Sequence, residues 1–281
     1  MQKILFHTFT FLLSKLSLSS IHSIGIIFGR LYFSLSKKNL NLLKENLINS
    51  GIFPESDIDF SVQQTIEELG KGILETFFIW GLNQKAALKL IHKVYGKNAI
   101  EKAEKSRKGI IFLAPHLGCF EINSIFYGEN KPITVMYRKA RKLWMSDLMI
   151  KGRKKGYVEL APADTSGLKK VLIALKKGQA VGILPDQVAD KGNGEYVNFF
   201  GKPAYTMLLA NKLIEKTEAQ IFMAYGERLK DGKGFNIHIE EINRRNIKTP
   251  LDLNKQVERF IKKNPTQYYW SYDRYKTVIS K

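Results

Sequence analysis

The sequence of 281 residues predicts an α/β fold: a mixed, mainly parallel sheet flanked by helices, preceded by an apolar helical segment. From about residue 110 onward, short apolar runs alternate with helical ones, a pattern typical of βαβ units. Residues 4–36, in contrast, carry only Lys15 and Arg30 as full charges. A chain of this length that is 44% hydrophobic can bury one large core. We therefore expect a hydrophobic anchor helix over 1–36 and one α/β domain over 37–281.

The amino-terminal segment is apolar but poorly matched to a simple membrane span. Its uncharged runs, 4–14 and 16–29, are each shorter than the ~18–20 residues that a span needs. Three readings stay open: a tilted span, a helix lying in the interface with its cations snorkelling, and a buried helical hairpin. We expect membrane association. If the segment spans, the lysines that follow it, Lys37, Lys38 and Lys44, place the rest of the chain in the cytoplasm.

Each element is predicted from local periodicity. Leu40, Leu43 and Leu47 recur at helical spacing until Gly51-Ile-Phe-Pro54 breaks the run. Further helices are expected over 56–80, 86–95, 121–126, 143–151, 168–177, 206–217 and 251–263. Apolar, β-branched runs predict strands over 110–114, 133–137, 157–160, 180–184, 220–225 and 235–239.

The charge composition limits the classes of molecule that this protein is expected to bind. Lysine and arginine number 45 against 26 acidic residues, a formal net charge of +19. Such a charge attracts nucleic acid, anionic lipid headgroups or an acidic protein, and does not choose among them. The single cysteine, Cys119, excludes an internal disulfide framework and suits a reducing compartment.

The most informative segment runs from Gly109 to Glu121. An apolar strand ends at Pro115-His116, and the carboxyl end of such a strand is where open α/β sheets place their ligands. Five residues turn a helix by ~140°, so His116 and Glu121 converge only if the histidine lies on the turn before the helix. The pair then predicts a general base and the carboxylate that orients it, although an isolated histidine is more often a core residue. Cys119 is not expected to be a nucleophile, and no metal site is predicted, because the histidine spacing of a zincin is missing.

This segment resembles the H-x4-D/E signature of the glycerolipid and lysophospholipid acyltransferases. In particular, His116-Leu-Gly-Cys-Phe-Glu121 resembles the branch that adds secondary acyl chains to lipid A, the late lauroyl and myristoyl acyltransferases. Further blocks follow in that family's order from about residue 37 to 276: Val135-Met-Tyr-Arg138, Arg153-Lys-Lys-Gly156, Ile183-Leu-Pro-Asp-Gln187, Asn198-Phe-Phe-Gly201 with Pro203, Gln267-Tyr-Tyr-Trp270 and Arg274-Tyr-Lys276. The chain departs at Cys119-Phe120, where relatives often have Asn-Trp, a change expected to affect packing more than chemistry.

The resemblance implies roles for particular residues. His116 and Glu121 would be catalytic, and Arg138 and Arg153 would bind substrate phosphate, with Arg141 extending the same patch. Asp186 and Gln187 would organise the pocket or bind acceptor hydroxyls, although an aspartate there could be only a helix cap. The apolar run of Phe199, Phe200 and Gly201 is compatible with a wall for an acyl chain and equally with an edge strand of the core.

The implied reaction is transfer of a fatty acyl chain from an acyl carrier protein thioester to a hydroxyl of a lipid A precursor, without a cofactor or an acyl-enzyme. The expected partners are acyl carrier protein, the precursor and lipids of the inner membrane of a Gram-negative-type cell, at its cytoplasmic face. No nucleic acid partner is expected. Two rivals stay open: the same chemistry on another glycolipid or a lysophospholipid, and a non-catalytic basic protein that binds membranes or nucleic acid.

Overall fold

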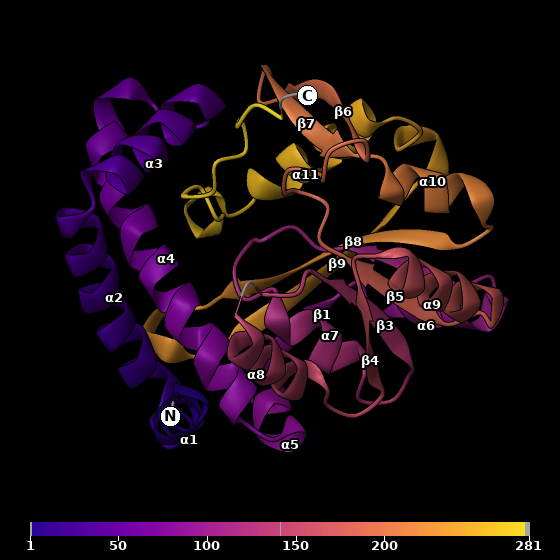
Figure 1. Ribbon diagram of the computed structural model, residues 1–281, viewed down its shortest axis with the longest axis horizontal. Helices are drawn as coiled ribbons and strands as arrows, with labels where there is room; N and C mark the ends of the chain where they lie inside the picture. The colour runs from indigo at the N-terminus through magenta and orange to yellow at the C-terminus, as the bar shows by residue number, and fades with distance from the viewer. Residues whose placement is uncertain (1, 141, 279–281) are drawn as a thin grey trace.

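The protein is built around one twisted sheet, as the computed structural model shows for residues 2–140 and 142–278 (Figure 1). Seven strands lie in the order β1-β9-β8-β2-β5-β3-β4, and every neighbouring pair is parallel except β8 and β9. In chain order these strands are β1 (Ile91–Tyr95), β2 (Ile110–Leu113), β3 (Ile133–Tyr137), β4 (Val158–Pro162), β5 (Ala180–Ile183), β8 (Gln220–Arg228) and β9 (Phe235–Ile242). The predicted mixed, mainly parallel α/β sheet is confirmed.

Helices cover both faces of the sheet because its central strands are apolar on both sides. Ile111 and Leu113 of β2 belong to one core cluster, whereas Ile110 and Phe112 belong to the other, as the two-residue period of a strand requires. The first cluster packs under α9 (Thr165–Lys176), α10 (Leu209–Lys216) and α11 (Pro250–Ile261). The second packs under α6 (Lys97–Ser106) and α7 (Glu121–Tyr127).

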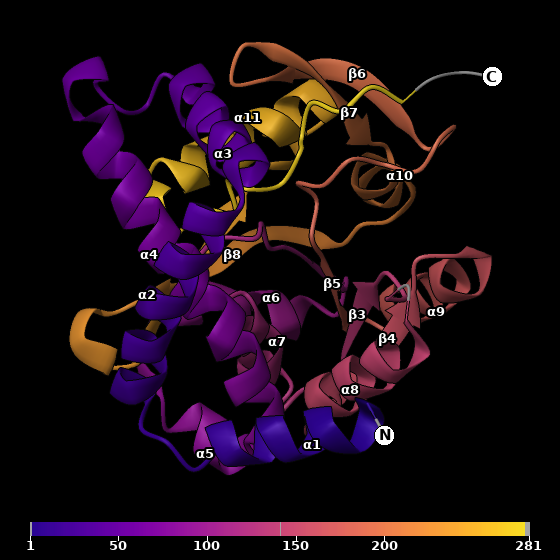
Figure 2. The ribbon, with the colours of Figure 1, turned by 60° about the vertical axis from the view of Figure 1, so that its left-hand side comes forward.

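The amino-terminal helices form a layer along one side of this core. They are α1 (Gln2–Leu13), α2 (Leu18–Leu35), α3 (Lys37–Ser50) and α4 (Ile58–Gly81), followed by the short α5 (Gln84–Leu88). The helix α2 lies along α4 in both ribbon views (Figures 1 and 2). Within the described residues, α2 is the one helix whose length and composition would let it cross a membrane. One helix from the sheet domain, α8 (Leu143–Arg153), contacts both α1 and α4.

Two elements differ from the periodicity-based prediction. The helix expected over 86–95 is wrong: α5 ends at Leu88, and Ile91–Tyr95 forms the edge strand β1 paired with β9. A five-residue edge strand is stabilised by this long-range pairing, so local periodicity does not reveal it. The helix expected from residue 206 begins only at Leu209, because β7 runs to Met207.

The strand β7 belongs to a hairpin that is separate from the main sheet. The strands β6 (Gly194–Phe199) and β7 (Lys202–Met207) pair antiparallel through the turn residues Phe200 and Gly201. Both turn residues have positive φ, 46° and 77°, as a two-residue hairpin turn of this hand requires. Glycine adopts such a φ readily, but a bulky phenylalanine does so at a cost. A hydrogen bond from the Phe200 N–H to Glu258 (2.7 Å) and ring packing on Trp270 hold it there.

Candidate active site

The sheet reverses its winding between β2 and β5, and this is where ligands bind in open α/β sheets. From β2 the chain passes over β5 to reach β3, whereas from β5 it passes over β2 to reach β8. His116 follows the carboxyl end of β2, and Asp186 follows that of β5. Because β2 and β5 are parallel neighbours, residues 70 positions apart meet at one edge of the sheet.

Asp186 holds His116 with both of its carboxylate oxygens. Its Oδ1 lies 2.9 Å from His116 Nδ1, and its Oδ2 accepts the backbone N–H of the same histidine at 2.8 Å. Burial of Asp186, which is 2% exposed, opposes ionisation, but the adjacent imidazole and these hydrogen bonds outweigh it and lower the pKa of Asp186. An ionised carboxylate can only accept, so Nδ1 carries the proton and Nε2 keeps its lone pair.

The His116 side chain stands between two hollows of the surface. Gln187 Nε2 lies 3.3 Å from His116 Nε2, and both side chains line two separate cavities. The first, the α4 cavity, has a volume of about 270 Å³ and lies between α4 and the loop after β2. The second, the strand-end cleft, has a volume of about 570 Å³ and is lined by residues that follow β3, β4 and β5. A proton acceptor shared by two cavities can serve two substrates that approach from different sides.

The loop that carries His116 is fixed by backbone contacts. Gly118 donates to the Gln267 carbonyl at 3.0 Å, and Cys119 donates to the Gly226 carbonyl at 2.7 Å. Gly118 has a φ of +59°, and a Cβ there would lie 2.1 Å from the Gly226 oxygen, so only glycine fits. Burial raises the pKa of the Cys119 thiol well above its usual range, which argues against a thiolate nucleophile at this position.

Glu121 does not contact the imidazole, and the predicted partnership needs correction. Glu121 begins α7, and its buried carboxylate forms a bidentate pair with Arg153 at the end of α8, with Nε to the two oxygens at 3.0 and 2.9 Å. Because the helix begins at Glu121 itself, its side chain is directed toward α8, and the carboxylate on His116 is that of Asp186. Glu121 still lines the α4 cavity together with His116.

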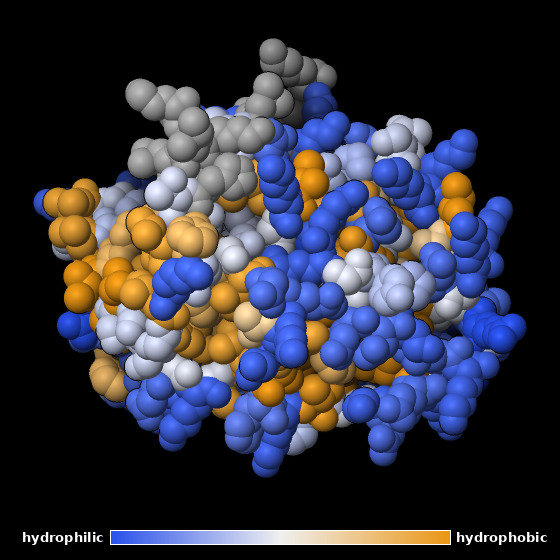
Figure 3. Space-filling view, turned by 90° about the horizontal axis from the view of Figure 1, so that it is seen from below, coloured by the Kyte–Doolittle hydropathy of each residue, from blue (hydrophilic) through white to orange (hydrophobic). Residues whose placement is uncertain are grey.

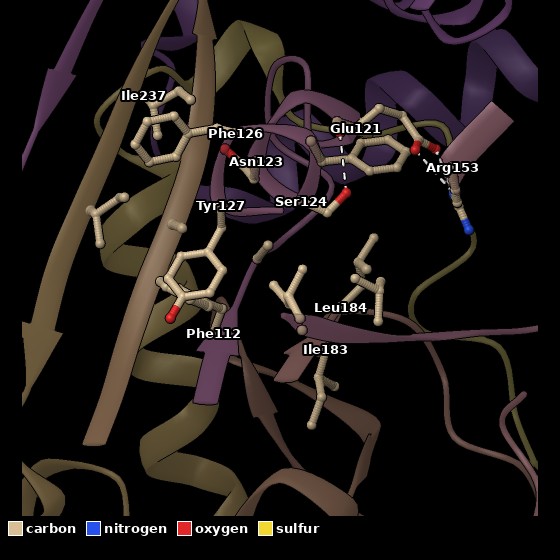
Figure 4. A pocket seen from close by; sticks show the side chains of 17 residues that line it. Phe112, Glu121, Asn123, Ser124, Phe126, Tyr127, Arg153, Ile183, Leu184 and Ile237 are labelled. Atoms are coloured by element: carbon tan, nitrogen blue, oxygen red, sulfur yellow. Dashed lines mark hydrogen bonds and ion pairs between the residues drawn. The ribbon is translucent and has the colours of Figure 1, made fainter. Parts of the chain in front are cut away.

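An apolar pocket lies directly behind the Glu121–Arg153 pair, between α7 and the sheet (Figure 4). The ion pair stands at one end, while Phe112, Tyr127 and Ile237 lie toward the other. The pocket has a volume of about 50 Å³. Arg153, Ile183 and Leu184 line both this pocket and the strand-end cleft, so the two are neighbours across these side chains.

The remaining predicted residues divide into two groups. Arg138 lines the strand-end cleft, donates to the Val188 carbonyl at 3.0 Å and lies 3.4 Å from Asp190. Phe199 and Phe200 are buried in the core beside Trp270, and neither they nor Gly201 line a cavity that His116 lines, so the expected acyl-chain wall is corrected to core packing and a hairpin turn. Arg141 lies outside the described residues.

Comparison with known proteins identifies the family of the chain. The family model described as "Bacterial lipid A biosynthesis acyltransferase" matches residues 2–277. The chain belongs to this family. It is similar to the lipid A biosynthesis lauroyltransferase of Escherichia coli K12, with 24% identity over 92% of this chain and 85% of that protein. It is also similar to a lipid A biosynthesis acyltransferase of Haemophilus influenzae Rd (23%; 91% and 83%) and to the palmitoleoyltransferase of Escherichia coli K12 (23%; 87% and 78%). Membership makes the chain an O-acyltransferase.

The acyltransferase site contains charged residues that the sequence did not single out. Arg228, at the end of β8, is bound by Glu75 through Nε and Nη2 at 2.5 and 2.6 Å and by Glu68 through Nη1 at 2.7 Å, and all three line the α4 cavity. Gln267 clamps the backbone of Arg228 through both amide atoms at 2.9 Å. Only Gln267 lay in a recognised sequence block; Arg228 and the two glutamates have no local signature, because they meet across more than 150 positions.

One further buried cation of the acyltransferase lies near the Glu121–Arg153 pair. Lys155 follows α8 and contacts the carbonyl oxygens of Gly152 and Trp80. Burial lowers its pKa to about 8, although the charge of Glu121 opposes the shift. It belongs to the Arg153-Lys-Lys-Gly156 block, in which the sequence analysis had assigned only the arginine.

Proposed function

We propose that this acyltransferase moves a fatty acyl chain from an acyl carrier protein thioester to a hydroxyl of a lipid A precursor, at the cytoplasmic face of the inner membrane. The observation that carries the proposal is the His116–Asp186 pair at the sheet's switch point, with His116 lining two cavities. The family match supports acyl transfer, and the curated relatives are named as acyltransferases of lipid A biosynthesis. An acidic carrier protein and phosphorylated lipids both suit a chain of net charge +19.

In the proposed reaction His116 acts as a general base. Its Nε2 takes the proton of the acceptor hydroxyl while that oxygen bonds to the thioester carbonyl carbon. The tetrahedral intermediate then expels the sulfur as the C–S bond breaks, and the imidazolium returns its proton to the leaving thiolate. The products are an ester and the carrier thiol. The Asp186 carboxylate fixes the tautomer and stabilises the imidazolium in between.

The neighbouring cavities suit the two ends of such substrates. Arg138 and Lys212 line the strand-end cleft, where a planar guanidinium and an ammonium can bind phosphate oxygens of the acceptor. The apolar pocket of Figure 4 adjoins the same cleft at Ile183 and Leu184, and its size suits only the terminal part of an acyl chain. We propose that the acyl chain of the donor lies over Ile183 and Leu184 and that its end enters the pocket.

A panel of acceptors tests the proposed reaction. Purified protein is incubated with isotope-labelled acyl carrier protein thioester and, separately, a lipid A precursor, a lysophospholipid and a mannosylated phosphatidylinositol. We expect a labelled ester with the lipid A precursor. If an ester formed only on another lipid, the proposal that a lipid A precursor is the acceptor would be wrong. Salt-sensitive RNA binding without transfer or thioester hydrolysis would instead favour the non-catalytic binding protein. Mass spectrometry of lipid A from cells with and without the protein then identifies the acyl chain that is transferred.

The carboxylate that serves the imidazole can be identified by Asp186→Asn. The amide keeps the size of the side chain but can donate to Nδ1, which favours the tautomer with its proton on Nε2 and removes the base. We expect kcat to fall about 10²–10⁴-fold, with a small change in KM. Steady-state transfer assays measure both parameters, and the thermal melting curve checks the fold.

Glu121→Gln provides the matched comparison through double-mutant cycles. Because Glu121 binds Arg153, the loss in Glu121→Gln/Arg153→Gln should be no larger than that of the more severe single variant. The losses of Glu121→Gln and Asp186→Asn should multiply. Strong coupling of Glu121 to Asp186, without coupling to Arg153, would return Glu121 to the role of imidazole partner.

The apolar pocket predicts a change in chain-length preference. A Cβ at Gly182 would make only ordinary van der Waals contact with Val135, so Gly182→Val should fill the pocket without breaking the sheet and should favour shorter chains. Phe112→Leu should enlarge it and favour longer chains. We expect shifts of roughly tenfold per methylene in the ratio of kcat/KM values, measured by competition between acyl donors. If both variants kept the parental chain preference, the chain would not enter this pocket.

A further inference from the structure

The outer faces of α1 and α2 are apolar and uncovered. More than half of the large apolar side chains that are exposed in the described part of the chain lie between residues 9 and 35: Phe9, Phe11, Leu12, Leu16, Ile24, Ile27, Phe28, Leu31, Tyr32 and Leu35. The space-filling view shows apolar side chains gathered on the left, where α1 and α2 lie, and polar ones on the right (Figure 3). A contiguous patch of this kind marks a contact with another apolar phase or protein.

The inner face of α2 packs on α4 in close backbone contact. Gly25 and Gly29 of α2 stand against Gly70 of α4, and a Cβ at Gly70 would lie 2.0 Å from the Gly25 oxygen and 2.9 Å from Gly29. Ile21 and Phe33, on the same face, are 0% and 3% exposed. The helix is therefore part of the folded domain along its length.

Polar contacts add to the close contact of Gly25 and Gly29 with Gly70, which we call the glycine seam. They also determine how α2 can lie in a membrane. His22 of α2 pairs with Glu75 of α4 at 2.5 Å in the interior, and Arg30 pairs with Glu67 at 2.5 Å. If α2 crossed a bilayer with the seam intact, α4 and its charged residues would enter the hydrocarbon beside it. Buried charge of that kind is costly. A helix that lies in the plane of the interface avoids this cost, because its charged inner face stays in protein.

Cations border the apolar face. No acidic residue precedes Glu45 in the sequence. Lys15, Arg30, Lys37 and Lys38 are exposed along and beside α1 and α2, and Lys15 lies over the Phe11 ring at 4.8 Å. Two acids near α2 are paired with cations: Glu67 with Arg30, and Asp231, 3.9 Å away, with Lys233. The combination suits anionic headgroups around an apolar interior.

We propose that the outer faces of α1 and α2 dock on the surface of an anionic lipid leaflet, with α2 in the plane of that leaflet and not across it. This attachment does not depend on the acceptor or on the reaction. It places the helix layer α2–α4, and the cavity behind α4, next to the lipid.

Flotation with vesicles tests the docking. Vesicles of phosphatidylethanolamine with phosphatidylglycerol should carry the wild-type protein, and vesicles of phosphatidylcholine should carry less of it. Ile24→Asp should lower binding at least tenfold. Ile173→Asp is the matched control, because Ile173 lies on α9 and is 43% exposed against 44% for Ile24. Equal binding of both variants, no binding of the wild type, or a lipid-free dimer that Ile24→Asp dissociates would overturn the proposal. Circular dichroism checks that both variants fold.

Depth measurements separate the flat helix from the spanning one. Cysteines placed at Ile24 and Leu35 are labelled with a fluorophore and quenched by lipids that carry quenchers at known depths; buried Cys119 supplies the background in the parent protein. The two positions are 11 residues apart, about 16 Å along the axis. A flat helix puts both labels at similar, shallow depth. A difference approaching 16 Å would show a crossing helix and overturn the orientation.

Discussion

His116→Ala should lower kcat/KM for acyl transfer about 10²–10⁴-fold while the protein stays folded, which is the range that a positioned general base contributes. The substitution removes the imidazole, which lines both cavities, and leaves the Asp186 carboxylate without the ring that it holds. Transfer of labelled acyl groups to the lipid acceptor measures the loss. We expect KM for both substrates to change much less than kcat, because the imidazole acts mainly in the transition state.

The control for this variant is another histidine–carboxylate pair in the same chain. His238 Nε2 lies 2.7 Å from Glu227, and its ring stacks on Tyr225 at 4.7 Å, but it lines neither cavity. His238→Ala should therefore lose packing and some stability but keep kcat. If His116→Ala retained full turnover in a folded protein, or if His238→Ala lost as much, the assignment of the base would fail.

The sequence located His116 at the end of its strand but not the carboxylate that contacts it, and the reason is topological. His116 could be placed because an apolar strand followed by a turn is a local signal. The neighbour of that strand could not, because β5 joins β2 through pairing of segments 70 residues apart. Glu121, close in sequence, therefore seemed the natural partner, although the start of α7 turns it toward Arg153.

The same distinction between local signals and long-range pairing explains which elements of the fold could be predicted. The central strands, apolar on both faces, were located to within a few residues, because burial on both sides leaves a local apolar run. The edge strand β1 and the β6–β7 hairpin were missed, since long-range pairing and one strained turn define them. For the same reason the ion-pair cluster of Arg228 has no sequence signature.

Arg228→Met should destabilise the fold by about 3–5 kcal/mol, because it takes the shared guanidinium away from the buried Glu75 and the half-buried Glu68. The guanidinium is 2% exposed, and it joins α4 to the end of β8 across the α4 cavity. Denaturant unfolding at neutral pH measures the loss. Arg259→Met is the matched control: its pair with Glu240 is about 41% exposed on both sides, so the cost should be about 0–1 kcal/mol.

The pH dependence of the same variant gives a second readout with a definite sign. Burial opposes ionisation of Glu68 and Glu75, but the charge and hydrogen bonds of Arg228, together with Lys71 beside Glu68 and His22 beside Glu75, outweigh it and lower the pKa of both carboxyls. Groups with depressed pKa values stabilise the fold above their unfolded pKa, and this contribution is lost as the pH falls through the folded value. The wild type should therefore keep its stability down to about pH 4. Arg228→Met removes the charge of Arg228 and its hydrogen bonds, and leaves only Lys71 beside Glu68 and His22 beside Glu75 to oppose the effect of burial. The two pKa values rise, and acid unfolding should begin at higher pH. Glu68→Gln/Glu75→Gln added to Arg228→Met should recover part of the loss, because neutral side chains no longer have to be buried as charges; no recovery would mean that packing of the guanidinium, and not its charge, holds α4 to β8.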